Sequence, residues 1–382
     1  GGKGSWIQNG VTAQTPSQTP AQLLNGLLND GNGNQWELDL YEDITVKSLG
    51  AVGDGVADDT LPIQAAINYQ DQVAVSFLNT SIGATVSSRA MPYVDYGKNK
   101  YSVTAPISVY TYIYMKGDQA LIVNDIAGGI EPVFRMTDGD WGNNAGWVGV
   151  VKDIQIAGNA FKLNTRPLVG DSLNEGKITF NGVTFTNADI ALEYDLQSSS
   201  VLFTRCKWDN CVQHIRQYAC DLLKIEGCWI SPRTDSISDY ESFFNLVGLQ
   251  AVVEDSVFVP AVQNGGGQVF EYSWFGNKTL TNGQGNPREG LTSFYSSGNR
   301  YGGEPGSCPI INWYRPIEFV GDMPTQINIK DGYTQSALGG GAIATSVNLF
   351  ELPNSIIIDD NIGALTQGYL VAISSTIVDF PA

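Results

Sequence analysis

Charged residues are scarce in this sequence, at 16% of 382 positions. Basic residues are the scarcer kind, 21 against 39 acidic ones, which gives a net charge of −18. Phosphate binding needs clustered Lys and Arg, so this balance argues against a nucleic-acid partner. The polar surface must come largely from Asn, Gln, Ser and Thr, a pattern that suits β-rich extracellular proteins with neutral or weakly charged ligands.

Cysteine and histidine are also few. The five Cys are an odd number without any Cys-x-x-Cys pair, which argues against a zinc site and against a disulfide framework. We therefore expect buried free thiols and folding in a reducing cytoplasm. The single histidine, His214, is the one possible centre of a Ser-His-Asp triad, but no Gly-x-Ser-x-Gly elbow accompanies it.

Long apolar runs and cofactor motifs are missing as well. No run approaches the ~20 residues that cross a membrane, and no signal peptide is visible. Walker, dinucleotide-binding and metal-hydrolase motifs are absent, and no tight Asp cluster indicates calcium-dependent elimination. We expect no membrane insertion, no metal and no cofactor.

The first part of the chain, residues 1–43, predicts a neck or linker rich in Thr, Pro, Gln, Asn and Gly. A short helix is predicted over residues 21–28, where four leucines recur with i, i+3, i+4 spacing: Leu23, Leu24, Leu27 and Leu28. Such a helix is too short to be stable alone. A small helical bundle between chains would stabilise it.

Residues 44–67, ITVKSLGAVGDGVADDTLPIQAAI, carry the most specific local signal. A short apolar strand is followed by a glycine-rich tight loop, and Asp58 or Asp59 can N-cap a helix after that loop. The apolar face of this helix would consist of Ile63, Ala66 and Ile67. We expect the helix to cover the open end of a stack of strands, which would otherwise expose unpaired backbone.

The spacing Gly50-x-x-Gly53-Asp54-Gly55-x-x-Asp58-Asp59-Thr60-x-x-Ile63-Gln64-x-Ala66-Ile67 resembles the opening motif of the pectate-lyase-like β-helix superfamily. Phage tailspikes and capsule or O-antigen depolymerases often begin their β-helix in this way. The resemblance implies an all-β fold, a right-handed parallel β-helix wound as a single-stranded solenoid. The motif is shared by lyases, hydrolases and non-enzymatic shafts, and its acidic residues are structural in that superfamily.

The resemblance also implies partners. It implies a homotrimer in the virion tail, folded in the host cytoplasm and acting outside the cell on bacterial surface polysaccharide. The chain begins Gly1-Gly2-Lys3-Gly4 rather than with Met. We expect it to be part of a longer protein that joins the phage tail or baseplate through its N-terminal part.

Internal repetition predicts the same solenoid. Five segments place an apolar residue three positions before a small or turn residue and a second apolar residue two positions after it: Val151/Ile154/Ile156, Phe180/Val183/Phe185, Phe203/Cys206/Trp208, Ile225/Cys228/Ile230 and Val253/Ser256/Phe258. A weaker sixth set is Ser296/Asn299/Tyr301. Stacking these sets makes Cys206 and Cys228 neighbours in an internal ladder and puts Asn187 and Asn210 in one turn ladder.

From about Tyr333 the spacing of the repeat changes. We therefore predict the β-helix over residues 44–330. Residues 331–382 are predicted to form a C-terminal β region that ends the shaft and helps to hold the trimer.

Glycoside hydrolysis needs one protonated and one ionised carboxyl group, ~5–5.5 Å apart for retention or ~6.5–9.5 Å apart for inversion. The segment ALEYDL predicts Glu193 and Asp195 on one outward strand face, ~6.5–7 Å apart. One coil later, His214, Arg216 and Tyr218 would also point outward, and a slip of one residue would place His214 beside Glu193 and Arg216 beside Asp195. The alternative for this first candidate pair is a solvated, salt-bridged face.

Glu226 and Glu254 are the second candidate pair. Each lies two residues before the turn position of its coil, so the two would be stacked one coil apart. Repulsion between two carboxylates at that spacing raises the pKa of one of them. One Glu would then be protonated and the other ionised, as catalysis by an acid and a base requires. The alternative is two Glu side chains that splay apart in solvent.

Tryptophans can provide platforms for sugars, because the apolar face of a pyranose packs on a flat ring. Trp229 lies one residue after the turn position, so we expect it to point outward beside Lys207 of the neighbouring coil. Further candidates are Trp141 and Trp147, in a Gly/Asn loop with Asp138 and Asp140, and Trp274 in a long insertion. Packing in the protein is the alternative role for each ring.

Three functions follow from these residues. The first is endo-hydrolysis of O-antigen or capsule by paired carboxylates. The second is a polysaccharide lyase, with His214 or Tyr218 as the base and Arg216 neutralising a uronate. The third is a non-catalytic receptor-binding shaft.

Overall fold

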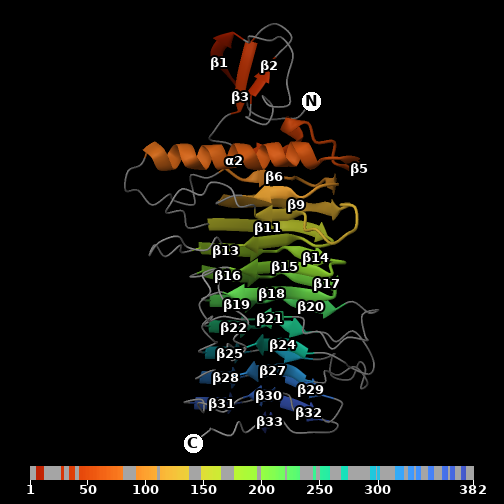
Figure 1. The fold of residues 1–382 in the computed structure, drawn as a ribbon, viewed down its shortest axis with the longest axis vertical. Coiled ribbons are helices and arrows are strands. Elements are labelled where there is room, and N and C mark those ends of the chain that lie inside the picture. Colours follow the sequence, from red (N-terminus) through yellow and green to blue (C-terminus); the bar gives the residue numbers. More distant parts are fainter. Residues whose placement is uncertain are drawn as a thin grey trace, which may run out of the picture.

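The structure is a computed structural model in which the following residues are described: 6–12, 27–29, 34–38, 43–80, 92–109, 112–136, 148–164, 176–195, 199–219, 222–232, 244–246, 250–258, 268–273, 293–297, 299–301, 315–321, 326–330, 333–336, 343–347, 355–359, 362–365 and 371–375. Strands dominate, and most of them pair in parallel. Figure 1 shows an elongated stack of coils that runs from helix α2 (Thr60–Thr80) at one end to strand β33 (Val371–Ser375) at the other.

Each coil contributes a strand to three ladders, which makes the chain a parallel β-helix. The first ladder contains β13 (Gly176–Asn181), β16 (Ser199–Thr204), β19 (Leu222–Glu226), β22 (Gln250–Glu254), β25 (Ser293–Ser297), β28 (Gln326–Lys330) and β31 (Ser355–Asp359). The second contains β14 (Thr184–Thr186), β17 (Lys207–Cys211), β20 (Trp229–Pro232), β23 (Val257–Phe258), β26 (Arg300–Tyr301), β29 (Tyr333–Ser336) and β32 (Ile362–Leu365).

The third ladder is a sheet of ten strands. Its members are β8 (Ile107–Val109), β10 (Phe134–Met136), β12 (Phe161–Asn164), β15 (Ile190–Asp195), β18 (Gln213–Ala219), β21 (Phe244–Leu246), β24 (Gln268–Ser273), β27 (Arg315–Gly321), β30 (Ile343–Val347) and β33. At the N-terminal end the coils are formed by β4 (Ile44–Thr45), the 3-10 helix η1 (Val46–Leu49), β5 (Asp54–Asp58), β6 (Val94–Asp95), β7 (Lys100–Val103), β9 (Tyr112–Asn124) and β11 (Val148–Ala157).

A residue in the left-handed conformation forms the corner between the first two ladders in successive coils. The corner residues, with φ between 48° and 65°, are Asp153, Gly182, Arg205, Gly227 and Asp255. Non-glycine residues seldom adopt this conformation, so the corner is a specified turn. At Gly182 a Cβ would lie 2.6 Å from Oδ1 of Asp153 in the preceding coil, so the Asp153 side chain would have to shift to admit it.

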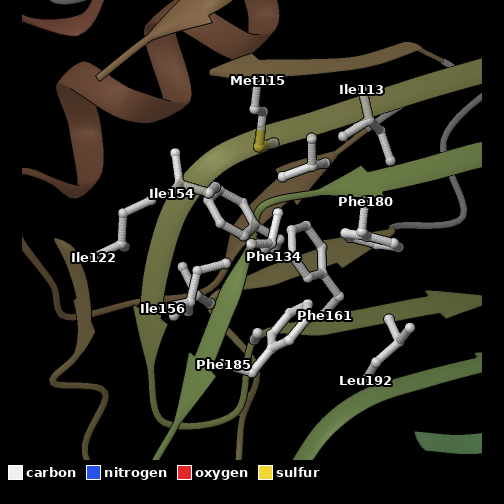
Figure 2. Packing of buried hydrophobic residues seen from close by; sticks show 14 of the residues in the cluster. Ile113, Met115, Ile122, Phe134, Ile154, Ile156, Phe161, Phe180, Phe185 and Leu192 are labelled. Atoms are coloured by element: carbon white, nitrogen blue, oxygen red, sulfur yellow. The ribbon is translucent and has the colours of Figure 1, made fainter. Parts of the chain in front are cut away.

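The core lies inside the coils, where like residues stack. Figure 2 shows Phe134, Phe161, Phe180 and Phe185 packed together from neighbouring coils. The rings of Phe180 and Phe203 stack with their centroids 5.0 Å apart. The described side chains of the five predicted sets are buried, which confirms the register inferred from the repeat.

A polar column runs through this core directly after the corner. The amide of Cys206 donates to Sγ of Cys228 at 3.3 Å, the amide of Cys228 donates to Oγ of Ser256 at 3.1 Å, and the amide of Ser256 donates to Oδ1 of Asn299 at 2.9 Å. The predicted internal cysteine ladder is therefore present, and the weaker sixth set belongs to it. In a turn ladder on the surface, Asn210 donates to Asn187 at 2.5 Å, also as predicted.

Helix α2 covers the N-terminal end of the coils (Figure 1). Its predicted apolar face, Ile63, Ala66 and Ile67, is buried. Gln64 exchanges two hydrogen bonds with the backbone of Ser108 in β8, at 2.7 and 3.0 Å. Gln70 does the same with Tyr114 in β9, at 3.2 and 2.7 Å. Each amide thus replaces the peptide group of a missing neighbouring strand.

Asp59 organises the glycine loop before the helix. Its carboxylate accepts hydrogen bonds from the amides of Val52 and Gly53 at 2.6 and 3.2 Å, and its carbonyl accepts the first helical bond from Ile63 at 3.1 Å. The acidic residues of the opening motif therefore have structural contacts, as the resemblance implied.

One expectation about the N-terminal part of the chain needs correction. Leu27 and Leu28 lie in β2 (Leu27–Asn29), which joins β1 (Trp6–Thr12) and β3 (Asn34–Leu38) in an antiparallel sheet, and not in a helix. Residues 21–26 are outside the described residues. Strand pairing also continues across residue 330, from β28 to β31 and from β27 to β30. The domain boundary predicted there stays a prediction. The trimer and the right-handed sense stay predictions.

Candidate functional site

Glu226 and Glu254 lie at the ends of β19 and β22, immediately before the corner. They are in register, one coil apart, as the repeat predicted. The ammonium of Lys224 lies between them, 3.0 Å from Oε2 of Glu226 and 2.9 Å from Oε2 of Glu254. These two carboxylate oxygens are therefore no more than about 6 Å apart.

Lys224 is a functional candidate that the sequence reasoning missed. Its hydrogen bonds to Glu254 and Glu226 raise the pKa of its ammonium, so it stays charged at neutral pH. The alternation of β19 indicates its position, because Lys224 is two residues before Glu226 on the same outward face. Lys224 and the two glutamates together carry one net negative charge. We call these three residues the glutamate cluster.

Trp229 lies beyond the corner at the start of β20. Its side chain is 46% exposed, which makes it the one aromatic among the exposed large hydrophobic residues of the described ranges. It is in register with Lys207 of the preceding coil and Val257 of the next. The outward orientation beside Lys207 was predicted, and the structure confirms it.

A partly apolar column borders the glutamate cluster on the first ladder. Leu202, Lys224, Val252 and Tyr295 follow one another in register, and all four are half-buried. Tyr295 was missed as a candidate, although it directly precedes Ser296 of the sixth repeat set. The column provides apolar surface beside the two carboxylates.

The first candidate pair lies on the ten-stranded sheet instead. Glu193 in β15 is ion-paired with Lys162 of the preceding coil at 3.1 Å, and its side chain is only 17% exposed. It stands in register with Arg216 of the next coil. The predicted slip of one residue is therefore wrong: Arg216 neighbours Glu193 and not Asp195. A bulge after Tyr194 pairs Asp195 with Ala219.

His214 was predicted to point outward, and this is wrong. Its side chain is fully buried, with its ring 6.4 Å from that of Trp208. Burial lowers the pKa of the imidazole to about 3. Gln213, His214 and Ile215 are all buried because the chain enters β18 from a corner, where the strict alternation of an extended strand does not hold. A buried neutral imidazole cannot contact a polysaccharide.

Several candidates cannot be placed. Trp141, Trp147, Trp274, Asp138 and Asp140 are outside the described residues. The backbones of Asp195 and Tyr218 lie in β15 and β18, but their side chains are outside the described part of the structure.

Among the described residues, no three His, Cys, Asp or Glu side chains come together in a way that could bind a metal ion. Within the same ranges no helix has the length and apolar character needed to cross a bilayer.

No family model and no curated protein matches the sequence. Solved structures similar to the chain include phage tailspikes and parallel β-helix proteins that modify polysaccharides. ORF18 of Geobacillus virus E2 aligns with 88% of this chain and 66% of its own, at 14% identity and a TM-score of 0.40.

Two further structures align over most of the chain. Pantoea stewartii WceF, a glycan biofilm modifying enzyme with a bacteriophage tailspike-like parallel β-helix fold, covers 93% of this chain and 42% of its own, at 12% identity and a TM-score of 0.43. The tailspike of Acinetobacter baumannii phage AM24 covers 98% and 63%, at 10% identity and a TM-score of 0.39. The chain thus spans less than two thirds of the length of each of the three proteins.

Proposed function

We propose that the chain is the shaft of a phage tailspike that binds bacterial surface polysaccharide on its side and hydrolyses it internally. The observation that carries the proposal is the outward glutamate cluster with the exposed ring of Trp229 across the corner. Paired carboxylates provide the acid and the base or nucleophile of glycoside hydrolysis, and an exposed ring provides a surface on which a sugar can stack.

The spacing of the pair favours retention of configuration. Oxygens no more than about 6 Å apart match the shorter of the two separations known for glycosidases, ~5–5.5 Å. One carboxyl group would protonate the leaving oxygen, and the other would attack the anomeric carbon. The carboxyl group that acts as the acid must be protonated. It must therefore lose its ion pair with Lys224, because a contacting ammonium favours the ionised carboxylate.

Glu193 with Asp195, the pair that the sequence ranked first, becomes the alternative pair for hydrolysis. Their i, i+2 positions on β15 leave room for an attacking water and would favour inversion. Glu193 is less exposed than Glu226 or Glu254 and is ion-paired with Lys162, so we rank this pair second.

A non-catalytic receptor-binding shaft is the second candidate function. It is favoured by a specific observation: each candidate carboxylate whose side chain is described is ion-paired with a lysine. A lyase is disfavoured, because His214 is in the core and Lys224, with its raised pKa, is a poor base. Tyr218 with Arg216 would be the remaining lyase residues.

The test uses the chain and bacterial surface polysaccharide, with reducing ends and absorbance of unsaturated uronate recorded together. Reducing ends alone indicate hydrolysis, both signals indicate a lyase, and neither indicates binding only. Glu226→Gln and Glu254→Gln are each expected to lower hydrolysis by ~10²–10⁴-fold while binding is kept. Glu131→Gln is the control, since Glu131 pairs with Arg135 away from the cluster.

The same assay ranks the two pairs. If Glu226→Gln and Glu254→Gln keep normal turnover and Glu193→Gln or Asp195→Asn abolishes it, the site lies on the ten-stranded sheet. If all four variants keep normal turnover, these carboxylates are not catalytic.

A further inference from the structure

We infer that the polysaccharide bound beside the glutamate cluster is uncharged, and that Trp229 is the residue on which one of its sugars stacks. This inference rests on the proposed function and names its substrate class. It is supported by the ion pairs of the cations near Trp229, by the exposed ring of Trp229 and by the net charge of the chain.

The lysine in register with Trp229 and the lysine of the glutamate cluster are both ion-paired with carboxylates of the protein. Lys207, next to Trp229, is ion-paired with Asp209 at 3.0 Å. Lys224 is held by Glu226 and Glu254 at 3.0 and 2.9 Å. A uronate or sialic acid would have to compete with these carboxylates for the same ammonium groups, so it would gain little from them.

The guanidinium of Arg205 is bonded on the side away from Trp229. Arg205 is the corner residue of the coil before Trp229, and its Nη2 donates to Oδ1 of Asn181 at 2.8 Å, one coil further from Trp229. Arg216, the cation in register with Glu193, belongs to the ten-stranded sheet and not to this side. Of the cations whose side chains the structure describes, the two closest to Trp229 in register and at the corner, Lys207 and Arg205, are therefore each engaged by a neighbouring polar group.

What the surface does offer suits an uncharged sugar. Trp229 presents a ring that is 46% exposed, with the half-buried Val257 in register on the next coil. Stacking of a pyranose on such a ring removes apolar surface from water and needs no charge on the sugar. Carboxylates such as those of Glu226 and Glu254 accept hydrogen bonds from hydroxyl groups.

The net charge of the whole chain also favours an uncharged ligand. At −18, its field opposes the approach of a polyanion at low ionic strength, whereas an uncharged chain is indifferent to it. Binding of the ligand is therefore expected to change little with salt, since screening acts only on charges.

The experiment measures binding of the full chain to two sets of purified, lipid-free polysaccharides: uncharged O-antigen chains and uronate-containing capsules. We expect binding within the uncharged set, with less than a twofold change between low and high salt. Trp229→Ala should weaken it about tenfold or more, the equivalent of losing the burial of one large apolar side chain. Trp229→Phe should restore part of the affinity.

Two controls separate stacking from charge. Lys207→Met removes the neighbouring cation, and Ile130→Ala truncates an apolar side chain that is 80% exposed elsewhere. Both should leave affinity for the uncharged chain within twofold. Tighter binding of a uronate-containing chain, no binding to any uncharged chain, or unchanged affinity of Trp229→Ala overturns the inference. Reducing ends are measured separately, so binding without cleavage counts against hydrolysis and not against the substrate class.

Discussion

At the scale of single residues, His214 shows what burial does to a titratable group. The folded protein keeps the imidazole neutral, with its pKa lowered to about 3 by burial. In the unfolded chain the pKa is near 6.5. Between these two values the unfolded state binds one more proton than the folded state, so stability falls as the pH falls through that window.

This predicts a slope of about 1.4 kcal/mol per pH unit from His214 alone, between roughly pH 6 and pH 3. Urea unfolding at several pH values measures it, with His214→Gln as the comparison. The variant should be less stable at pH 7 but lose less stability on acidification than the parent. Equal pH dependence of the two proteins would show that the imidazole is not buried in its neutral form.

The polar column predicts the reactivity of the thiols. Burial and the contact with Cys228 raise the pKa of the Cys206 thiol, and Cys206, Cys211 and Cys228 are all buried. Only the thiolate reacts readily. We expect none of the three to be alkylated in the folded protein and all three to react in denaturant, as mapped by peptide mass spectrometry. Rapid labelling of Cys206 or Cys228 without denaturant would contradict the internal ladder.

At the scale of elements, helix α2 covers the open edge of the strand stack and bonds to it. A parallel stack ends in backbone N–H and C=O groups without a neighbouring strand. Gln64 and Gln70 supply an amide to Ser108 and Tyr114, and Gln70 also donates to the carbonyl of Pro92 at 2.6 Å. The helix therefore pairs with the edge through side chains and also covers the core below it.

Replacing Gln70 tests this. Gln70→Leu keeps the size of the side chain and leaves buried groups of Tyr114 and Pro92 without their hydrogen bonds, at about 1–3 kcal/mol for each such group. We expect the free energy of unfolding to fall by about 2–4 kcal/mol. Gln155→Leu is the matched control, because Gln155 bonds only to the exposed Gln119. Similar losses of unfolding free energy in both variants would show that Gln70 does not stabilise the edge in this way.

At the scale of the whole molecule, the solenoid keeps each coil in contact mainly with the coils before and after it. A lateral site is then built from consecutive coils. Glu226 and Glu254 come from neighbouring coils, and Trp229 comes from the strand across the corner. This arrangement explains why residues far apart along the chain meet on one side.

The predicted homotrimer belongs to this scale. Light scattering of the chain at micromolar concentration is expected to give three times the mass of one chain. A monomeric mass under those conditions would contradict the trimer while leaving the β-helix and the glutamate cluster unaffected.

The coil pattern, and everything that follows from position within a coil, could be predicted from the residues alone. The burial of the repeat sets, the Cys206–Cys228 contact, the stacked Glu226 and Glu254 and the outward Trp229 were all predictable. The reason is that a regular repeat brings equivalent positions of successive coils together, so sequence spacing translates directly into contact.

Where the repeat is interrupted, the neighbours of each side chain depend on how the coils are arranged in the folded chain. The burial of His214 depends on a corner where strand alternation fails, and the register of Glu193 with Arg216 depends on where β18 begins. The ion pairs of Lys162 and Lys224 depend on the direction that a long, flexible side chain takes between two coils. Local periodicity carries no information about corners or about such directions, because both are set by contacts between coils.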